Sequence, residues 1–387
     1  MALLSMAVAV PLVAQQSKVY REGNAWIEEI TGTMPVGREV RVNTDMGSVK
    51  VQGNAPSPSY VIRKRSFAAT EEAARKQFDE LRISVVKSAE RDFIEGRLLG
   101  KNLARLSADF VVQVPRELEM VRVETRSGAL NLSSLTATIL GTTGGGAVHL
   151  DDLGGPVKIS SAGGAVDGGT MGADFTLSSG GGDVRINKIS GQAKVTLGGG
   201  KVYIGAVKGL TITTGAGGIE VRKCDGDLRA TTDGGNLTFG DVSGSVHAET
   251  GGGSVRLASA SGPVQVATGG GSVELYRLAQ GAQVETGAGP ITVEFLGNHG
   301  AMTDSSLHTA AGDVSVCLPG NMPVTVHAAS DMTNGKGIFS DFPALRINTT
   351  GGTYGPKAMS AEGALNGGGP MLRVRTTIGQ INFRRCH

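Results

Sequence analysis

The sequence contains TGGGSVRL at Thr250–Leu257 and TGGGSVEL at Thr268–Leu275, two copies of one motif placed eighteen residues apart. The pattern of glycine, any residue, aliphatic, any residue, aliphatic recurs in steps of 18 residues, with a single step of 17. Its first aliphatic residue falls at Leu130, Val148, Val166, Val184, Val202, Ile219, Leu237, Val255, Val273 and Ile291. Because alternate residues of a β-strand point to opposite faces, each copy predicts a short strand with one buried side.

A second, mostly aliphatic series lies half a period away, so each unit of about 18 residues contains two short strands. Its members are Ile139, Val157, Phe175, Ala193, Leu210, Leu228, Val246, Val264 and Ala282. So short a unit cannot bury its apolar side alone, and each strand must pair in parallel with its counterpart in the next unit. We therefore predict an all-β, single-stranded parallel β-solenoid, or β-helix, whose ten coils would extend about 48 Å at about 4.8 Å each. We expect a right-handed coil, although the spacing does not fix the hand.

Glycine triplets precede the first strand of five coils and mark its corner. They are Gly144–Gly146, Gly180–Gly182, Gly198–Gly200, Gly251–Gly253 and Gly269–Gly271. Glycine is suited to a corner where the chain needs a positive φ or where two coils approach without Cβ atoms. A glycine-rich loop that holds phosphate needs a helix N-terminus after it. Here a strand follows, which argues against a phosphate site.

The composition excludes several classes of protein. Of 387 residues, 60 are glycine and only 4% are aromatic, so the apolar core must be built from small aliphatic side chains. The net charge is +2, and the longest basic run is Arg63-Lys64-Arg65, which we interpret as a solvated strand edge. A nucleic-acid partner is not expected, because such proteins carry a clustered basic surface that neutralises phosphates.

The N-terminal residues Met1–Gln16, MALLSMAVAVPLVAQQ, are apolar up to Ala14 and are typical of a secretory leader. The apolar run is shorter than the roughly 18 residues that a membrane span needs. No basic residue precedes it, which suggests that the true start lies upstream, and a buried N-terminal strand is the alternative. We expect an exported protein without a transmembrane span, located in the periplasm, in the outer envelope or outside the cell.

The chain is expected to divide into four parts: the leader 1–16, an N-terminal cap 17–120, the solenoid 121–330, and a loop-rich segment with closing coils 331–387. The cap begins with an isolated coil, Val40–Val51, after which the repeat stops for some 75 residues. Thr70 is placed to cap a helix that would use Ala74, Phe78 and Leu81 as its apolar stripe. This insertion would cover the first edge of the solenoid, because an open edge invites aggregation. Within it, Trp26 and Phe78 are expected to pack rather than to bind a sugar.

Three cysteines cannot form a disulfide framework, and none has CxxC spacing. Cys317 and Cys386 lie in the same terminal zone, so their pairing in an oxidising compartment remains open. Cys224 lies about five coils from Cys317, or about 24 Å, beyond the reach of a disulfide. We predict that Cys224 is a free thiol.

A calcium-binding β-roll also uses two short strands per coil, but it needs an aspartate before the aliphatic residue in repeat after repeat. Only Asp183 fills that place among Ala147, Ala165, Asp183, Lys201, Gly218, Asn236, Ser254, Ser272 and Pro290. Asp225, Asp227 and Asp233 form a local acidic cluster, which we interpret as solvated turn carboxylates rather than a calcium site. No metal and no cofactor are predicted.

Catalysis would need an acid, base or nucleophile on an exposed face of the coil. The outward residues of the first face are Asn131, His149, Asp167, Arg185, Tyr203, Glu220, Thr238, Arg256, Glu274 and Thr292. Asp167 and Glu274 are six coils apart, too far to act as a pair, and Arg256 beside Glu274 predicts a surface ion pair. The second face, Lys158, Thr176, Lys194, Thr211, Arg229, His247, Gln265 and Gln283, is mildly basic without an acid.

The histidines give no metal spacing, and no GxSxG motif occurs. We expect His299 and His308 in loops and His327 at the end of a strand, and His149, His247 and His387 are the others. No catalytic residue is therefore assigned. A polysaccharide-active β-helix enzyme that uses Asp167 or Arg185 remains the enzymatic alternative.

The order of these motifs resembles one known family. Val40–Gly53 (VRVNTDMGSVKVQG), the helix-bearing insertion, the TGGGSVRL and TGGGSVEL coils and Asn366–Arg385 (NGGGPMLRVRTTIGQINFRR) resemble the bacterial DUF4097 "putative adhesin", or toastrack, β-solenoid family. The resemblance implies an exported or envelope protein and supplies no catalytic residue. It favours a non-enzymatic, adhesin-like protein that binds an envelope or surface component, glycan or protein. The alternative is a structural or envelope-stress-sensing module with no ligand of its own. The oligomeric state stays open.

Overall fold

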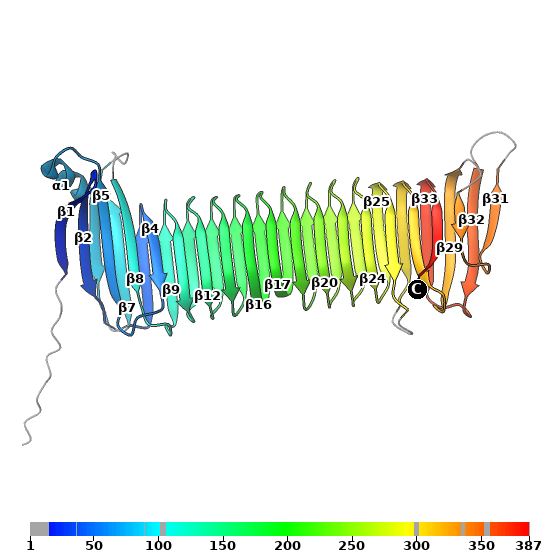
Figure 1. The fold of residues 1–387 in the computed structure, drawn as a ribbon, viewed down its shortest axis with the longest axis horizontal. Helices are drawn as coiled ribbons and strands as arrows, with labels where there is room; N and C mark the ends of the chain where they lie inside the picture. The colour runs from blue at the N-terminus through cyan, green and yellow to red at the C-terminus, as the bar shows by residue number, and fades with distance from the viewer. Residues whose placement is uncertain are drawn as a thin grey trace, which may run out of the picture. The chain divides into compact units, whose positions relative to one another are not determined.

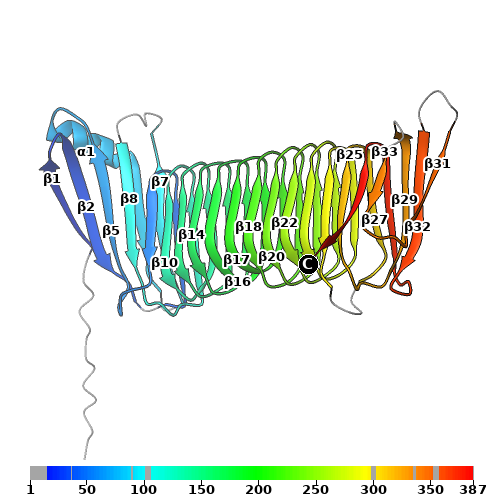
Figure 2. The same ribbon diagram turned by 45° about the vertical axis from the view of Figure 1, so that its right-hand side comes forward.

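The computed structural model describes residues 15–35, 37–88, 90–100, 106–297, 302–333, 337–351 and 357–386. The leader prediction falls on residues 1–16, nearly all of them outside this described part. Among the described residues strands dominate and one helix occurs, and most strands pair in parallel with the next coil (Figures 1 and 2). The all-β parallel β-solenoid is therefore confirmed, while its hand stays a prediction. The chain divides into two compact units, unit 1 (Met1–Ala162) and unit 2 (Gly163–His387).

Unit 1 holds two sheets and the helix. Its elements are β1 (Gln16–Glu22), β2 (Ala25–Thr33), β3 (Glu39–Thr44), β4 (Ser48–Gln52), β5 (Ser59–Ser66), α1 (Glu71–Asp79), β6 (Leu81–Val86), β7 (Arg91–Leu98), β8 (Leu106–Gln113), β9 (Met120–Thr125), β10 (Leu130–Leu135), β11 (Thr138–Thr143), β12 (Val148–Leu153) and β13 (Val157–Ser161). One sheet has the order β1-β2-β5-β8-β4-β10-β12. The other has the order β6-β7-β3-β9-β11-β13.

The first coil, β3 and β4, is isolated in the sequence but not in space. β3 pairs in parallel with β9, and β4 pairs in parallel with β10, so the pause in the repeat leaves no gap between coils. The inserted strands β7 and β8 pair with the other side of this coil. The insertion thus continues both sheets outward, and α1 contacts β2, β5 and β6 at that end (Figure 1).

The helix forms where its cap predicts. The hydroxyl of Thr70 accepts a hydrogen bond from the Ala73 N–H, and Ala74 and Phe78 are buried. Leu81 is buried too, but as the first residue of β6 rather than as part of the helix. Trp26 is half-buried on β2 with an arginine over its ring, so it packs less deeply than Phe78.

The basic run Arg63-Lys64-Arg65 is not a solvated strand edge, because β5 pairs with β2 on one side and β8 on the other. Lys64 is buried, and its Nζ donates to the carbonyl of Phe78 at 2.9 Å and lies 2.9 Å from a Glu28 carboxylate oxygen. It thereby ties the C-terminus of α1 to the sheet. Every second residue of a strand faces inward, and here the lysine falls on that side with partners to satisfy it.

The described residues of unit 2 continue the repeat and form strands but no helix. Its elements are β14 (Val166–Met171), β15 (Phe175–Ser179), β16 (Val184–Leu197), β17 (Val202–Thr214), β18 (Ile219–Cys224), β19 (Leu228–Thr232), β20 (Leu237–Val242), β21 (Val246–Thr250), β22 (Val255–Ala260), β23 (Val264–Thr268), β24 (Val273–Leu278), β25 (Ala282–Ala288), β26 (Ile291–Phe295), β27 (Ser305–Ala311), β28 (Val314–Pro319), β29 (Val324–Thr333), β30 (Ile338–Ser340), β31 (Arg346–Thr350), β32 (Lys357–Leu365), β33 (Met371–Ile378) and β34 (Ile381–Cys386). The register equals the repeat: Val255 pairs with Val273, and Val202 pairs with Ile219 across the 17-residue step.

A row of buried hydroxyls lines one corner of the coil, beside the aliphatic core between the two sheets. The Oγ1 atoms of Thr232, Thr250, Thr268 and Thr286 each donate to a glycine carbonyl fifteen residues earlier, at 2.8–3.2 Å. These carbonyls belong to the corner glycines. At Gly200, φ is +118° and an added Cβ would meet the carbonyl of Gly182, as the predicted corner geometry requires.

The C-terminal strands do not close the solenoid, contrary to the prediction. β33 pairs with β27 on one side and β29 on the other, and β34 pairs with β28 and β30 (Figure 1). The last coil is therefore inserted between two earlier ones. The stretch 331–361, expected to be loop-rich, contributes β30, β31 and part of β32, and β31 pairs antiparallel with β32.

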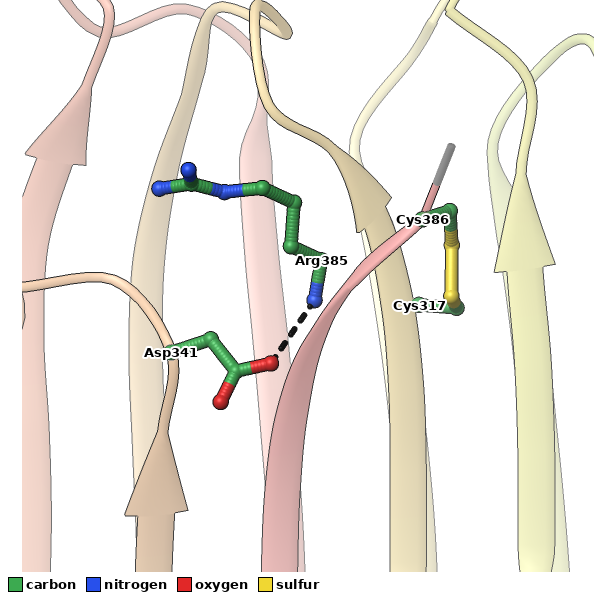
Figure 3. The surroundings of a disulfide bond; sticks show 4 residues. All are labelled: Cys317, Asp341, Arg385 and Cys386. Carbon is green, nitrogen blue, oxygen red and sulfur yellow. Dashed lines mark hydrogen bonds between the residues drawn. A yellow bond between two sulfur atoms is a disulfide. The ribbon is translucent and has the colours of Figure 1, made fainter.

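A disulfide joins the inserted coil to its neighbour. Cys317 of β28 and Cys386 of β34 are bonded, with their Cα atoms 5.5 Å apart, and the Asp341 carboxylate accepts a hydrogen bond from the Arg385 N–H at 3.1 Å (Figure 3). Cys224 is free, as predicted, and it is buried.

Candidate functional site

The outward row of the first face lies on consecutive strands in unit 2, as the repeat predicts. The register aligns Asp167, Arg185, Tyr203, Glu220, Thr238, Arg256, Glu274 and Thr292. Six strand spacings, about 29 Å, separate Asp167 from Glu274. The two carboxylates therefore cannot flank one glycosidic bond. Asn131 and His149 belong to the corresponding row of unit 1.

A hollow of about 280 Å³ opens around Tyr203 on this face. Its polar lining consists of Asp183, Arg185, Lys201, Tyr203, Glu220, Asn236 and Thr238. The guanidinium carbon of Arg185 lies 5.4 Å from the centre of the Tyr203 ring, and this cation–π contact orients the ring. Tyr203 is half-buried while its charged neighbours are exposed, so it is less solvated than the charged side chains of the hollow.

The hollow exists because one coil lacks a side chain at the position directly before its first strand, where the neighbouring coils have one. The residues before successive strands are Asp183, Lys201, Gly218 and Asn236, and Gly218 belongs to the coil of 17 residues. Asp183 accepts a hydrogen bond from the Lys201 N–H at 2.8 Å, and Asn236 accepts one from the Ser254 N–H at 2.9 Å. These bonds fix both walls, and the gap at Gly218 lies between them.

The hollow offers an aromatic ring, two basic and two acidic side chains, and an amide, with no excess of either charge. Such a set can donate and accept several hydrogen bonds to hydroxyl groups while the ring contacts an apolar C–H surface. These contacts suit a sugar. Sequence reasoning placed Tyr203 and Arg185 on this face, but it missed the hollow.

Tyr276 is a second tyrosine of the same face, two residues beyond Glu274, and the predicted outward row did not include it. Its hydroxyl donates to Glu274 Oε2 at 3.2 Å, and the Arg256 guanidinium lies 5.7 Å from its ring. Burial, and then the Glu274 charge, raise the pKa of Tyr276 above its ordinary value. The predicted ion pair of Arg256 and Glu274 is present at 3.2 Å.

The second face is not free of acids, contrary to the prediction. Glu249 lies two residues beyond His247 on β21, and its carboxylate is 2.7 Å from His247 Nε2. The other ring nitrogen lies 3.0 Å from the Gln265 amide oxygen. The predicted row took one outward residue from each strand, His247 in this case. It left out Glu249, which is two positions further along β21 and points the same way.

Two members of the acidic turn cluster, Asp225 and Asp227, bind side chains or backbone groups of the chain. Asp225 forms an ion pair with Lys223 at 2.8 Å, and Asp227 accepts hydrogen bonds from the N–H and hydroxyl of Ser245. Those bonds hold the pKa of Asp227 below its ordinary value. Asp233 lies in the turn that follows β19. Within the described ranges, no group of three or more His, Cys, Asp or Glu side chains could hold a metal ion.

The histidines lie on strands rather than in loops where the structure describes them. His308 is within β27, and His327 is in the interior of β29, with Nδ1 3.4 Å from Glu362. Both positions correct the prediction, because the flanking segments turned out to continue the coil. His149 and His247 are on β12 and β21, and His299 and His387 lie outside the described residues.

Comparisons with known proteins add two weak structural likenesses. No protein-family model matches the chain, and no curated protein matches its sequence. A "putative cell adhesion protein" from Clostridium sporogenes has a TM-score of 0.18 and 9% identity, covering 93% of this chain and 100% of that chain. A "putative adhesin" from Parabacteroides distasonis has a TM-score of 0.24 and 12% identity, covering 75% of this chain and 95% of that chain. Both TM-scores lie well below 0.5, too low to support a conclusion about this chain.

Among the described residues, no helix is both long and apolar enough to cross a membrane.

Proposed function

We propose that this chain is a non-enzymatic, adhesin-like protein of the cell envelope that binds a surface polysaccharide through the first face of unit 2. The hollow at Tyr203 is the observation that supports it, because a rigid stacked sheet holds an oriented ring and hydrogen-bonding groups on both sides of a gap. Pre-positioned groups lose little freedom when a ligand binds.

The proposal includes export, with residues 1–16 as the leader, 17–120 as the cap, 121–330 as the solenoid and 331–387 as the C-terminal part that holds the inserted coil. The Cys317–Cys386 disulfide supports an oxidising compartment outside the cytoplasm. The envelope location is an independent part of the proposal and is tested by fractionating cells that produce the full chain.

The test measures binding of the full chain to an array of purified microbial surface polysaccharides. Tyr203→Ala should weaken binding at least about tenfold, whereas Tyr203→Phe should keep most of it because the ring remains. Gly218→Gln should also weaken binding, because its side chain would fill the hollow, and an added Cβ has only the Asn236 carbonyl as a neighbour, at 3.3 Å.

Tyr276→Ala is the matched control, because Tyr276 has an arginine over its ring on the same face but does not line the hollow. Equal losses in the Tyr203 and Tyr276 variants would reject the hollow as the binding site. Release of new reducing or unsaturated ends from a bound polysaccharide would instead favour the enzymatic alternative. Binding to no surface polysaccharide would reject the proposed function.

A further inference from the structure

Unit 1 has a second hollow, larger than the one at Tyr203, on the outer face of β3, β7 and β9. Its volume is about 850 Å³, within the range of roughly 300–1,000 Å³ found for ligand pockets. Its apolar lining, among the described residues, consists of Val86, Phe93 and Met120, and Val86 is 54% exposed. Within the same described ranges, the charged lining consists of three arginines and three glutamates: Arg38, Arg41, Arg91, Glu39, Glu90 and Glu119.

Two of these arginines have a carboxylate of their own. Arg91 Nε lies 2.8 Å from Glu39, and Arg38 Nε lies 3.5 Å from Glu119. Both glutamates line the same hollow, so these pairs are balanced in charge. Arg41 is the remaining arginine of the lining.

Arg41 is the least satisfied of the three. The register places it between Phe93 and Arg122, and its guanidinium carbon lies 5.5 Å from the Phe93 ring. Its carboxylate partner is Glu124, at 3.5 Å, and Arg122 Nε holds that same oxygen at 2.7 Å. The Nε of Arg41 is buried and has no hydrogen-bond partner.

The Arg41 side chain lines the hollow and is 31% exposed, so its terminal Nη groups, whose carboxylate contact at 3.5 Å is shared with Arg122, are the donors that a ligand can reach. A carboxylate suits these donors, because its two oxygens match the planar fork of a guanidinium. The apolar residues beside Arg41 would contact the remainder of such a ligand.

We propose that this hollow binds a small organic carboxylate, with the carboxylate on Arg41 and an apolar carbon skeleton against Val86, Phe93 and Met120. The site lies in unit 1 and is independent of the polysaccharide site proposed in unit 2. Either can therefore fail without the other.

Isothermal titration of the full chain with sodium octanoate tests the assignment. Octanoate should bind saturably, and Arg41→Gln should weaken it at least about tenfold because the carboxylate loses its charged partner. Glu124→Gln should tighten binding, because that carboxylate no longer competes for Arg41. An increase is not expected from a variant that merely damages the sheet.

Two further ligands separate the parts of the proposal. Octanamide keeps the chain without the charge, and glucuronate keeps the charge on a polar ring, so each should bind at least about tenfold more weakly than octanoate. Arg126→Gln, which removes an exposed arginine of the same unit outside the hollow, should leave octanoate binding unchanged. Absence of saturable octanoate binding, no effect of Arg41→Gln, or glucuronate binding as tightly as octanoate would overturn the proposal.

Discussion

At the scale of single residues, Asp92 carries the clearest pH dependence. It is fully buried on β7, and neither carboxylate oxygen has a well-formed hydrogen bond. Burial raises its pKa from 3.8 to about 6, and the nearby Ser88 backbone offsets only part of this rise. The folded chain thus binds this proton more tightly than the unfolded chain, so the stabilisation is complete below about pH 4 and is lost as the pH rises through about 6.

We therefore expect the free energy of unfolding of the wild type, relative to Asp92→Asn, to fall by up to about 2 kcal/mol between about pH 4 and pH 7. Denaturant titrations at several pH values measure this difference. The contributions of the other titrating groups are common to both proteins and cancel. Asp151→Asn, at an exposed aspartate on β12, is the matched control. Parallel profiles for the wild type and Asp92→Asn would show that Asp92 does not titrate in this range.

The corner hydroxyls give a second prediction for single residues. Thr250 donates to the Gly235 carbonyl at 2.9 Å and accepts from the Gly253 N–H at 3.1 Å, so Thr250→Val leaves two backbone groups, one buried and one half-buried, without that partner. We expect a loss of about 1–3 kcal/mol in the free energy of unfolding. Thr250→Ser, which keeps the hydroxyl, should lose less. If the Thr250→Val variant proves as stable as the wild type, the corner hydroxyls do not contribute to stability. That outcome is conceivable because an apolar residue, Leu197, occupies the equivalent buried position in its own coil.

Some features of these sites could be predicted from the sequence and others could not, and the difference has a physical reason. Outward positions such as Tyr203 follow from strand alternation alone. The hollow beside Tyr203 arises from an absent side chain at Gly218, which matters only when three coils are aligned. Arg41 and Phe93 are 52 positions apart in the sequence and become neighbours through a strand pairing that no local pattern encodes.

At the scale of elements, the inserted last coil is expected to depend on its disulfide. Cys317 and Cys386 close a loop across a sequence separation of 69 residues, within which β29–β32 form. A cross-link over such a loop restricts the unfolded chain and contributes about 4 kcal/mol in the chain-entropy description. We expect Cys386→Ser to lower the thermal midpoint of unfolding in non-reducing buffer.

The wild type in reducing buffer should reproduce that loss, and Cys386→Ser should respond little to the reductant. Cys224→Ser is the control for a cysteine outside the disulfide. Burial raises the pKa of the Cys224 thiol, so the folded chain should also resist alkylation there. A reductant-insensitive wild type would mean that β33 and β34 are held by strand pairing alone.

The repeat predicts strand pairing within the regular coils, but it does not predict the pairing of the first and last coils of the chain. The repeat placed Val255 against Val273 because sequence spacing and register coincide. It failed for β3 and β33, whose partners include strands far away in the sequence, β9 and β27. Every coil offers the same aliphatic edge, so periodicity alone cannot say which coil a terminal strand joins.

At the scale of the whole molecule, a solenoid predicts that damage stays local. Leu257 is fully buried on β22, between Phe239 and Leu275 of the adjoining coils. Leu257→Ala should cost about 2–5 kcal/mol through lost burial and a cavity. Because each coil contacts only its neighbours, the loss should fall on the coils that touch β22 and fade with distance.

Hydrogen exchange measured by mass spectrometry resolves this pattern. We expect amide protection to fall most in β20, β22 and β24 and least in β14 and β28, two strands near either end of the same unit. Arg256→Ala, one residue away at an exposed ion pair, should change protection little because such pairs contribute only about 0–1 kcal/mol. A uniform loss across Gly163–His387 would instead show that unit 2 opens as one cooperative body, in which nearest-neighbour coupling exceeds the stability of any single coil.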